Sequence, residues 1–193
     1  MSDLHWTAFR GENRIAGGSP VEVVTAIRAG GHDGVLVFDD ATGKPVDLDL
    51  RGTLEDCLGR LPKNEVKPGE QPERRPGRPK LGVVPREVTL LPRHWEWLGQ
   101  QPGGASVALR KLVDAARAAT GAQDGRRRAQ EAADRFMRAV GGDQPGYEDA
   151  ARALYAGQAE PFKMLTESWP KDVRDHARYL AKDAFATGPA DGK

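Results

Sequence analysis

Short apolar runs separated by turn residues at the start of the chain predict strands. Residues 6–9 and 14–16 form two such runs around a Gly-Glu-Asn turn. Residues 35–38 are a continuous apolar run, and residues 46–50 alternate apolar and acidic positions after a turn at residues 40–43. The alternation predicts a last strand with one face in the core and one in water.

Two helices are predicted among these strands. Each is preceded by a residue pair with the spacing of a capping box, in which a hydroxyl accepts from a backbone N–H and a carboxylate reaches back: Ser19 with Glu22, and Thr53 with Asp56. The first helix has its apolar face at Val23, Val24 and Ile27, and the second runs through Leu61. Residues 1–61 are therefore predicted to be a small α+β domain.

Residues 62–80 read as a basic linker, because they are dense in Pro, Gly and charge and lack aromatic residues. The end of the linker, residues 74–80, resembles the AT-hook motif, which lies along the DNA minor groove. Pro76 replaces the first arginine of the motif core. The resemblance implies DNA contact by Arg75, Arg78 and Lys80, and a solvated basic linker is the alternative.

The stretch from 81 to 119 is the one around which we expect the chain to be organised. Residues 86–91 are rich in β-branched and aliphatic residues and predict a strand, and Pro92 suits a first helical position. The helix that follows should stop at residues 102–104, Pro-Gly-Gly. A second helix is predicted to start at Ala105 or Ser106, with apolar residues at helical spacing.

This order of strand, helix, Gly-rich turn and helix resembles the ribbon-helix-helix fold of bacterial DNA-binding dimers. The resemblance rests on the strand running into LPRHWEWL and on GGASVALRKLV. It implies that two chains pair their strands into a ribbon that enters the major groove, while the second helix grips a phosphate. The whole chain also looks like a bacterial family of unknown function, which implies no activity.

The resemblance assigns roles to individual residues. Strand side chains alternate between two faces, and we place the apolar ones inside. The expected dimer core is Val88, Leu90, Trp95, Leu98, Leu109 and Leu112. The expected DNA contacts are Glu87 and Thr89 in the groove, and Arg86, Arg93, Ala105 and Ser106 on phosphates.

The rest of the chain predicts a helical C-terminal region, residues 126–186. Glycines at 121 and 125 suggest a break, and apolar residues at helical spacing then predict helices over 126–140, 147–156 and 161–167. A last helix should follow Ser-Trp-Pro at 168–170. The overall fold class is α+β.

Charge is unevenly distributed along the chain, although the net charge is only +1. Residues 67–128 carry thirteen basic and six acidic residues, whereas residues 1–66 carry seven and eleven. A polyanionic partner is therefore expected to meet the middle of the chain. The single cysteine, Cys57, is expected to be a buried small hydrophobe. With no disulfide, signal peptide or membrane-spanning run, we expect a cytoplasmic protein with no membrane partner.

The sequence offers little for catalysis. The four histidines are scattered without ligand spacing, and the glycines before Ser106 lack the Lys-Ser/Thr of a phosphate-binding loop. We therefore expect no catalytic residues, metal or cofactor. The enzyme alternative is a Mg²⁺ site formed by convergence of Asp39, Asp40, Asp47 and Asp49.

The sequence thus favours a non-catalytic protein that acts as a homodimer on double-stranded DNA, either a transcriptional regulator or a nucleoid-associated protein. The alternative is a dimerisation or protein-interaction module that keeps the helical ribbon but does not bind DNA.

Overall fold

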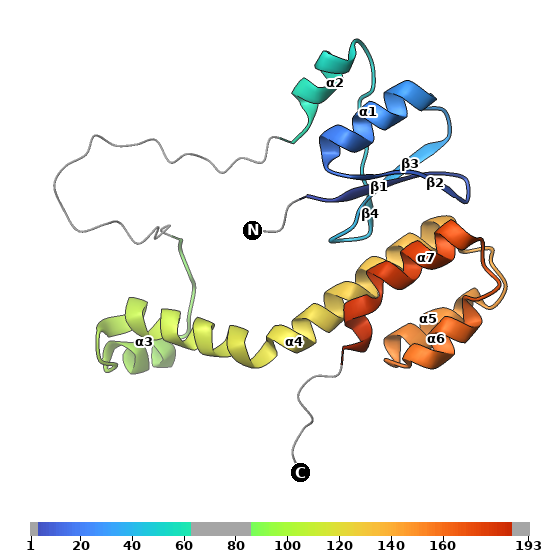
Figure 1. Cartoon of the computed structure of the whole chain (residues 1–193). Coiled ribbons are helices and arrows are strands. Elements are labelled where there is room, and N and C mark those ends of the chain that lie inside the picture. Colours follow the sequence, from blue (N-terminus) through green and yellow to red (C-terminus); the bar gives the residue numbers. More distant parts are fainter. Residues whose placement is uncertain (1–3, 63–85, 187–193) are drawn as a thin grey trace. The chain divides into compact units, whose positions relative to one another are not determined.

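A computed structural model describes residues 4–62 and 86–186 of the chain (Figure 1). The chain divides into two compact units. The sheet–helix unit consists of Met1–Lys63 together with Ala122–Lys193, and the central unit is Asn64–Gly121. The N-terminal and C-terminal parts of the chain, which look separate in the sequence, therefore fold into one unit.

The N-terminal part forms a four-stranded antiparallel sheet in the order β2-β1-β3-β4. The strands are β1 (Trp6–Arg10), β2 (Asn13–Gly18), β3 (Val35–Asp39) and β4 (Lys44–Pro45). Helix α1 (Pro20–Gly30) connects β2 to β3, and α2 (Leu54–Arg60) follows the sheet. The strands at 6–9, 14–16 and 35–38 and both helices were predicted from the sequence.

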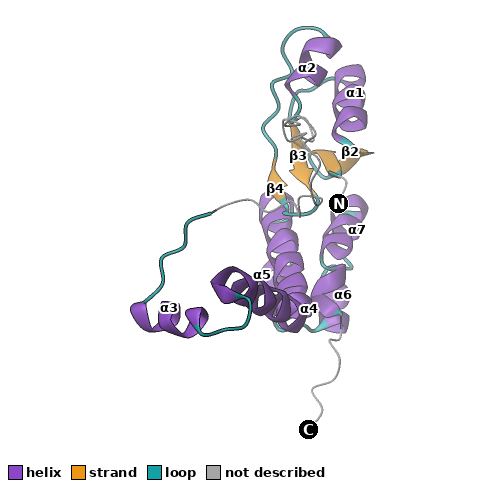
Figure 2. Ribbon diagram, turned by 90° about the vertical axis from the view of Figure 1, so that its left-hand side faces the viewer, coloured by secondary structure: helices purple, strands orange, loops and turns teal. Residues whose placement is uncertain are grey.

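Both faces of the sheet are covered. On one face, Trp6, Ala8 and Val37 pack with Val23 and Ile27 of α1. The opposite face packs against the C-terminal helices, and Figure 2 shows α1 and those helices on opposite sides of the sheet. Alternate residues of β1 thus enter two different cores.

The second core is built from helices close to the end of the chain. These are α4 (Gly104–Val140, of which the part from Ala122 belongs to this unit), α5 (Tyr147–Tyr155), α6 (Ala159–Leu165), α7 (Lys171–Leu180) and the 3₁₀ helix Lys182–Phe185. Phe136 of α4 is the aromatic centre of this core. Its ring centroid lies 5.1 Å from that of Phe9 and 5.2 Å from that of Phe38. Aromatic contacts therefore join residues from the two ends of the sequence. None of the described helices combines the length and the apolar character needed to cross a membrane.

Local sequence signals place the helix starts correctly. Ser19 accepts from the Glu22 N–H while the Glu22 carboxylate accepts from the Ser19 N–H, and Thr53 and Asp56 form the same reciprocal pair. Each cap satisfies backbone donors that the helix itself cannot pair. Cys57, on α2, is 2% exposed, which confirms that it is a buried residue.

Two predictions about secondary structure are wrong. Residues 46–50 are not a strand, since β4 ends at Pro45, and arginine side chains bind the carbonyl groups at the end of this segment and just after it. Arg28 donates to the carbonyls of Leu50 and Gly52, and Arg60 donates to those of Asp49 and Arg51.

The predicted helix break at residues 121–125 is also absent, since α4 continues through both glycines to Val140. A glycine within a helix costs roughly 1 kcal/mol relative to alanine, and a long helix tolerates that cost. The second helix of the central stretch therefore extends into the sheet–helix unit.

The turn between β3 and β4 fits closely against α4. Gly43 has φ +64°, and a Cβ there would lie 2.0 Å from the carbonyl oxygen of Ala132. Arg135 donates to the carbonyl of Thr42 at 2.7 Å beside it. Only glycine allows this approach of two backbones.

His176 lies among the aromatic residues of this core although it can carry a charge. Its ring centroid is 4.6 Å from Phe136 and 5.4 Å from Phe9, and the residue is 4% exposed. Burial lowers its pKa from 6.5 to about 4, and the positive charges of Arg14 and His5 add to this effect. The folded protein therefore holds a neutral His176 at neutral pH.

We predict that acid destabilises the fold through His176. A folded pKa below the unfolded value gives stability that is fully present above pH 6.5 and lost as the pH falls toward 4. The shift corresponds to a loss of about 3 kcal/mol in the free energy of unfolding. Urea denaturation at a series of pH values should show this loss, and it should shrink in His176→Phe.

Other titrating groups set the control for this measurement. Burial raises the pKa of Asp40, which faces His176, so protonation of Asp40 in acid acts on stability in the opposite direction. His32 is exposed, and His32→Gln should keep the full acid loss. If the free energy of unfolding of His176→Phe fell in acid as much as that of the unmodified protein, the loss would not come from His176.

Candidate functional site

The central unit contains two helices and the residues before them. Helix α3 (Pro92–Gly99) starts at Pro92 as predicted, and the carbonyl of Leu91 accepts from the N–H groups of His94 and Trp95. Residues 86–91 form neither helix nor strand in the single chain. A strand needs a second strand to pair with, and the described residues of the central unit supply none. The ribbon strand therefore stays a prediction.

A tight glycine turn joins α3 to α4. Gly103 and Gly104 have φ values of +86° and +75°, which a side chain would oppose. The Gly104 N–H donates to the carbonyl of Gln101 at 3.0 Å, and a Cβ on Gly103 would lie 3.2 Å from the Val107 side chain. The turn was predicted, and α4 starts at Gly104, close to the expected Ala105 or Ser106.

The residues expected in a dimer core are only partly covered in one chain. Leu98 is buried, at 3% exposed, and Leu90 and Leu109 are half-buried. Several large apolar side chains of this unit are instead between 44% and 54% exposed: Val88, Leu91, Trp95, Trp97, Leu112 and Val113.

An apolar pocket of about 270 Å³ lies among these side chains. It is lined by Leu90, His94, Trp97, Leu98, Leu109 and Leu112, so four residues of the expected core surround it. The two helices thus form a shallow apolar surface that one chain leaves open to solvent. Large exposed apolar patches of this kind mark interaction sites in soluble proteins.

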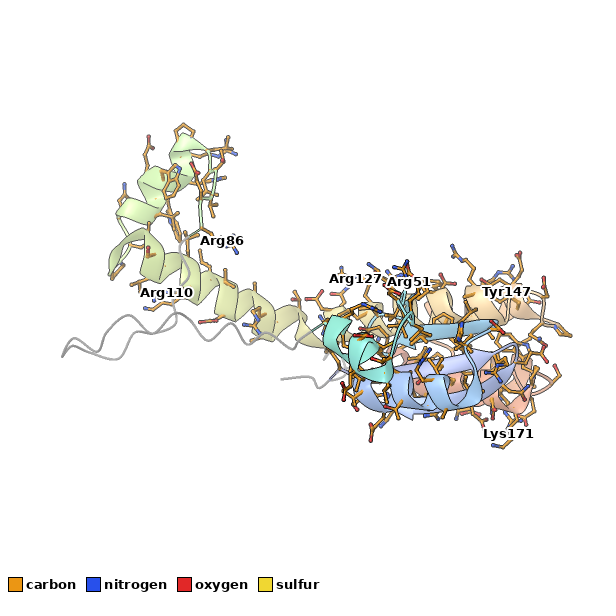
Figure 3. All side chains as sticks on the ribbon, turned by 90° about the horizontal axis from the view of Figure 1, so that it is seen from above. Arg51, Arg86, Arg110, Arg127, Tyr147 and Lys171 are labelled. Carbon is orange, nitrogen blue, oxygen red and sulfur yellow. The ribbon has the colours of Figure 1, made fainter. Side chains whose placement is uncertain are left out.

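The residues expected to meet DNA lie on the outside of the unit where the structure describes them. Arg86, Glu87, Thr89 and Arg93 are exposed. Figure 3 labels Arg86 and Arg110, which both belong to this unit.

The expected phosphate-binding residues of the second helix lie in its first turn. Ala105 is half-buried and Ser106 is exposed. Both lie at the N-terminus of α4, where the first backbone N–H groups have no acceptor within the helix. The Ser106 carbonyl accepts from the Arg110 side chain at 3.1 Å. Arg75, Arg78 and Lys80 lie outside the described residues, so the structure does not bear on the expected basic arm.

The four aspartates of the enzyme alternative do not form one site. Asp39 accepts from the backbone and side chain of Thr42, and Asp49 accepts from the Arg51 side chain. Asp40 is bound to His5 instead. Within residues 4–62 and 86–186 no group of three His, Cys, Asp or Glu side chains is arranged to hold a metal ion.

Sequence reasoning missed one cluster of polar residues in the sheet–helix unit. His5, Asp40 and His176 lie far apart in the sequence, and the fold brings them together at the ends of β1 and β3 and on α7. Spacing along the chain gives no signal for such a group. The only available indication was that His5 and Asp40 flank two strands that could pair.

Residues 5–181 match the model of a family described as an uncharacterised protein conserved in bacteria, DUF2239. No curated protein and no solved structure matches the chain. The match spans the sheet, the central unit and the C-terminal helices.

Proposed function

The chain belongs to this uncharacterised bacterial family, and we propose that it is a homodimeric DNA-binding protein that uses the central unit. The observation that carries the proposal is the open apolar surface of α3 and the first part of α4. A transcriptional regulator or a nucleoid-associated protein would have this arrangement. The role is one of binding and involves no catalysis.

A second copy of the chain is the partner that fits this surface best. The order of a short apolar segment, a helix, a glycine turn and a helix is the order of a ribbon-helix-helix protomer. In that fold two protomers bury each other's helices and pair their leading segments into a ribbon. An identical partner would cover Trp95, Trp97 and Leu112, and it would give residues 86–91 a strand to pair with.

The charges near this surface suit a nucleic acid. Arg86 and Arg93 flank the apolar segment and are exposed, and Arg110 and Lys111 follow in α4. Residues 67–128 carry an excess of seven positive charges. Phosphate contacts supply most of the sequence-independent affinity for DNA, so positive charge beside a ribbon favours DNA binding.

The alternative is an interaction module that dimerises through the same surface and does not bind DNA. Glu87 favours this alternative, because it is exposed within the segment that would enter the groove and would repel phosphates. Dimerisation is common to both proposals, and DNA binding separates them.

We predict that Leu112→Glu converts the dimer into a monomer. Leu112 is 49% exposed in the single chain, so the substitution should leave the fold of one chain intact. In the dimer it would bury an unpaired charge, which costs several kcal/mol. Light scattering should report twice the chain mass for the unmodified protein and one chain mass for the variant.

Met164→Glu is the matched control for this experiment. Met164 is 77% exposed and lies on α6 of the sheet–helix unit. This variant should remain a dimer. A monomeric unmodified protein at micromolar concentration, with full helicity by circular dichroism, would contradict the dimer.

We also predict that DNA affinity depends on salt through Arg86 and Arg93. Each phosphate contact contributes a slope of about 0.9 in a plot of log affinity against log salt. Arg86→Ala and Arg93→Ala should each flatten the slope by about that amount and weaken binding to two unrelated duplexes alike. Fluorescence anisotropy across a salt series measures both quantities.

Two further variants test whether the salt dependence comes from Arg86 and Arg93. Arg152→Ala, in α5 of the other unit, should leave the slope unchanged. Thr89→Ala should change the preference between duplexes and keep the slope, because a groove-facing residue reads bases. A dimer that binds neither duplex at low salt would refute DNA binding and support the interaction module.

A further inference from the structure

A polar pocket of about 350 Å³ lies in the sheet–helix unit. It is bounded by the beginning of β1, the beginning of β2, the residue after β3 and one side of α7. All of its lining side chains are polar, and those that matter here are His5, Arg14, Asp40, His176 and Tyr179. This pocket has no part in the proposed dimer or DNA contacts.

Two buried polar atoms at this pocket lack a hydrogen-bond partner. The side chains of Asp40 and His176 are 5% and 3% exposed. Oδ2 of Asp40 accepts from Thr7 at 3.0 Å and binds Nδ1 of His5 at 2.7 Å. Within the described part of the chain, however, Oδ1 of Asp40 and Nε2 of His176 have no partner.

These two atoms do not satisfy each other. They are 3.5 Å apart, which is long for a hydrogen bond. Buried polar atoms of folded proteins are almost always paired. Trp6 Nε1 is the other such atom among the described side chains, and it does not line this pocket.

The same pocket also holds the positive charge of Arg14, which acts on Asp40 without forming an ion pair with it. The Arg14 backbone N–H donates to Asp172 at 2.9 Å, which fixes this residue at the pocket. No ion pair of its guanidinium occurs among the described residues. The nearby Lys171, by contrast, is paired with Asp175 at 3.4 Å, and Figure 3 labels Lys171 at the start of α7.

An unmatched carboxylate oxygen and an unmatched guanidinium in one small pocket select a ligand with both charges. A sugar would leave Arg14 without a counter-charge, and an inorganic anion would leave Asp40 Oδ1 without a donor. A small zwitterion satisfies both, through charge-assisted hydrogen bonds. The volume is sufficient for a molecule of this size, and the half-exposed ring of Tyr179, stacked on His176, is an apolar surface for its side chain.

We propose that this pocket binds a free α-amino acid, with its ammonium group on Asp40 and its carboxylate on Arg14. Binding would bring Tyr179 against the ligand and supply the hydrogen-bond donor that Asp40 Oδ1 lacks. The proposal rests on the sheet–helix unit alone and is independent of DNA binding.

The first test is thermal unfolding of the full chain with each standard amino acid at about 10 mM, since a ligand of the folded state raises the melting temperature by mass action. The best ligand is then measured by calorimetry beside two of its analogues. Its N-acetyl derivative lacks the ammonium group, and its decarboxylated amine lacks the carboxylate. Each analogue should bind at least about tenfold more weakly than the amino acid.

Variants assign each charge of the ligand to its partner. Arg14→Gln, on an exposed side chain, should bind the amino acid and its amine equally weakly. Asp40→Asn should weaken the amino acid at least about tenfold, which is 1.4 kcal/mol. Asp47→Asn, exposed and outside this pocket, should bind as the unmodified protein does.

The proposal is overturned if no amino acid raises the melting temperature. It is also overturned if a sugar or phosphate binds instead, or if Arg14→Gln still distinguishes the amino acid from its amine. Should Asp40→Asn not fold, the comparison of the two ligands on Arg14→Gln decides the matter.

Discussion

Burial of β1 on both of its faces is the constraint on which the sheet–helix unit depends. Trp6 and Ala8 pack toward α1, while Phe9 packs toward Phe136 of α4. The N-terminal part supplies a cover for only one face. The other cover comes from helices that are synthesised last, so the sheet is complete only when the end of the chain has folded onto it.

This arrangement has a consequence for the central unit. Asn64–Gly121 is inserted into the sequence of the sheet–helix unit and is attached to it at both ends. Among the residues that the structure describes, none from the inserted unit belongs to the two cores of the sheet. Its exposed apolar side chains, such as Trp95, Trp97 and Leu112, therefore have no cover within these cores.

Signals that act over a few residues were predictable from the sequence. The two capping boxes, the start of α3 at Pro92 and the glycine turn at Gly103 depend on near neighbours alone. Residues 46–50 show where such reasoning fails, because arginines from two helices compete for their carbonyl groups. The apolar positions Trp95 of α3 and Leu112 of α4 were also predictable, since helical spacing marks an apolar face whether or not a partner covers it.

The polar pocket was beyond the reach of sequence reasoning for a different reason. His5 and Asp40 adjoin β1 and β3, Arg14 lies in β2 and His176 in α7, so both strand pairing and the packing of α7 on the sheet are needed to bring them together. His176 lies three residues after Val173 and four before Leu180, so helical spacing places it on the apolar face of α7, but only the fold shows which residues it meets. The ribbon stays a prediction, because its strands would pair only between two chains.

The most direct test of the central claim is the composition of a complex with a short DNA duplex. Sedimentation equilibrium of the full chain with one labelled duplex gives the number of chains bound to it. The account predicts two chains on each duplex, since a ribbon forms only between two copies. A complex with a single chain, or a dimer that sediments without the duplex at low salt, would contradict it.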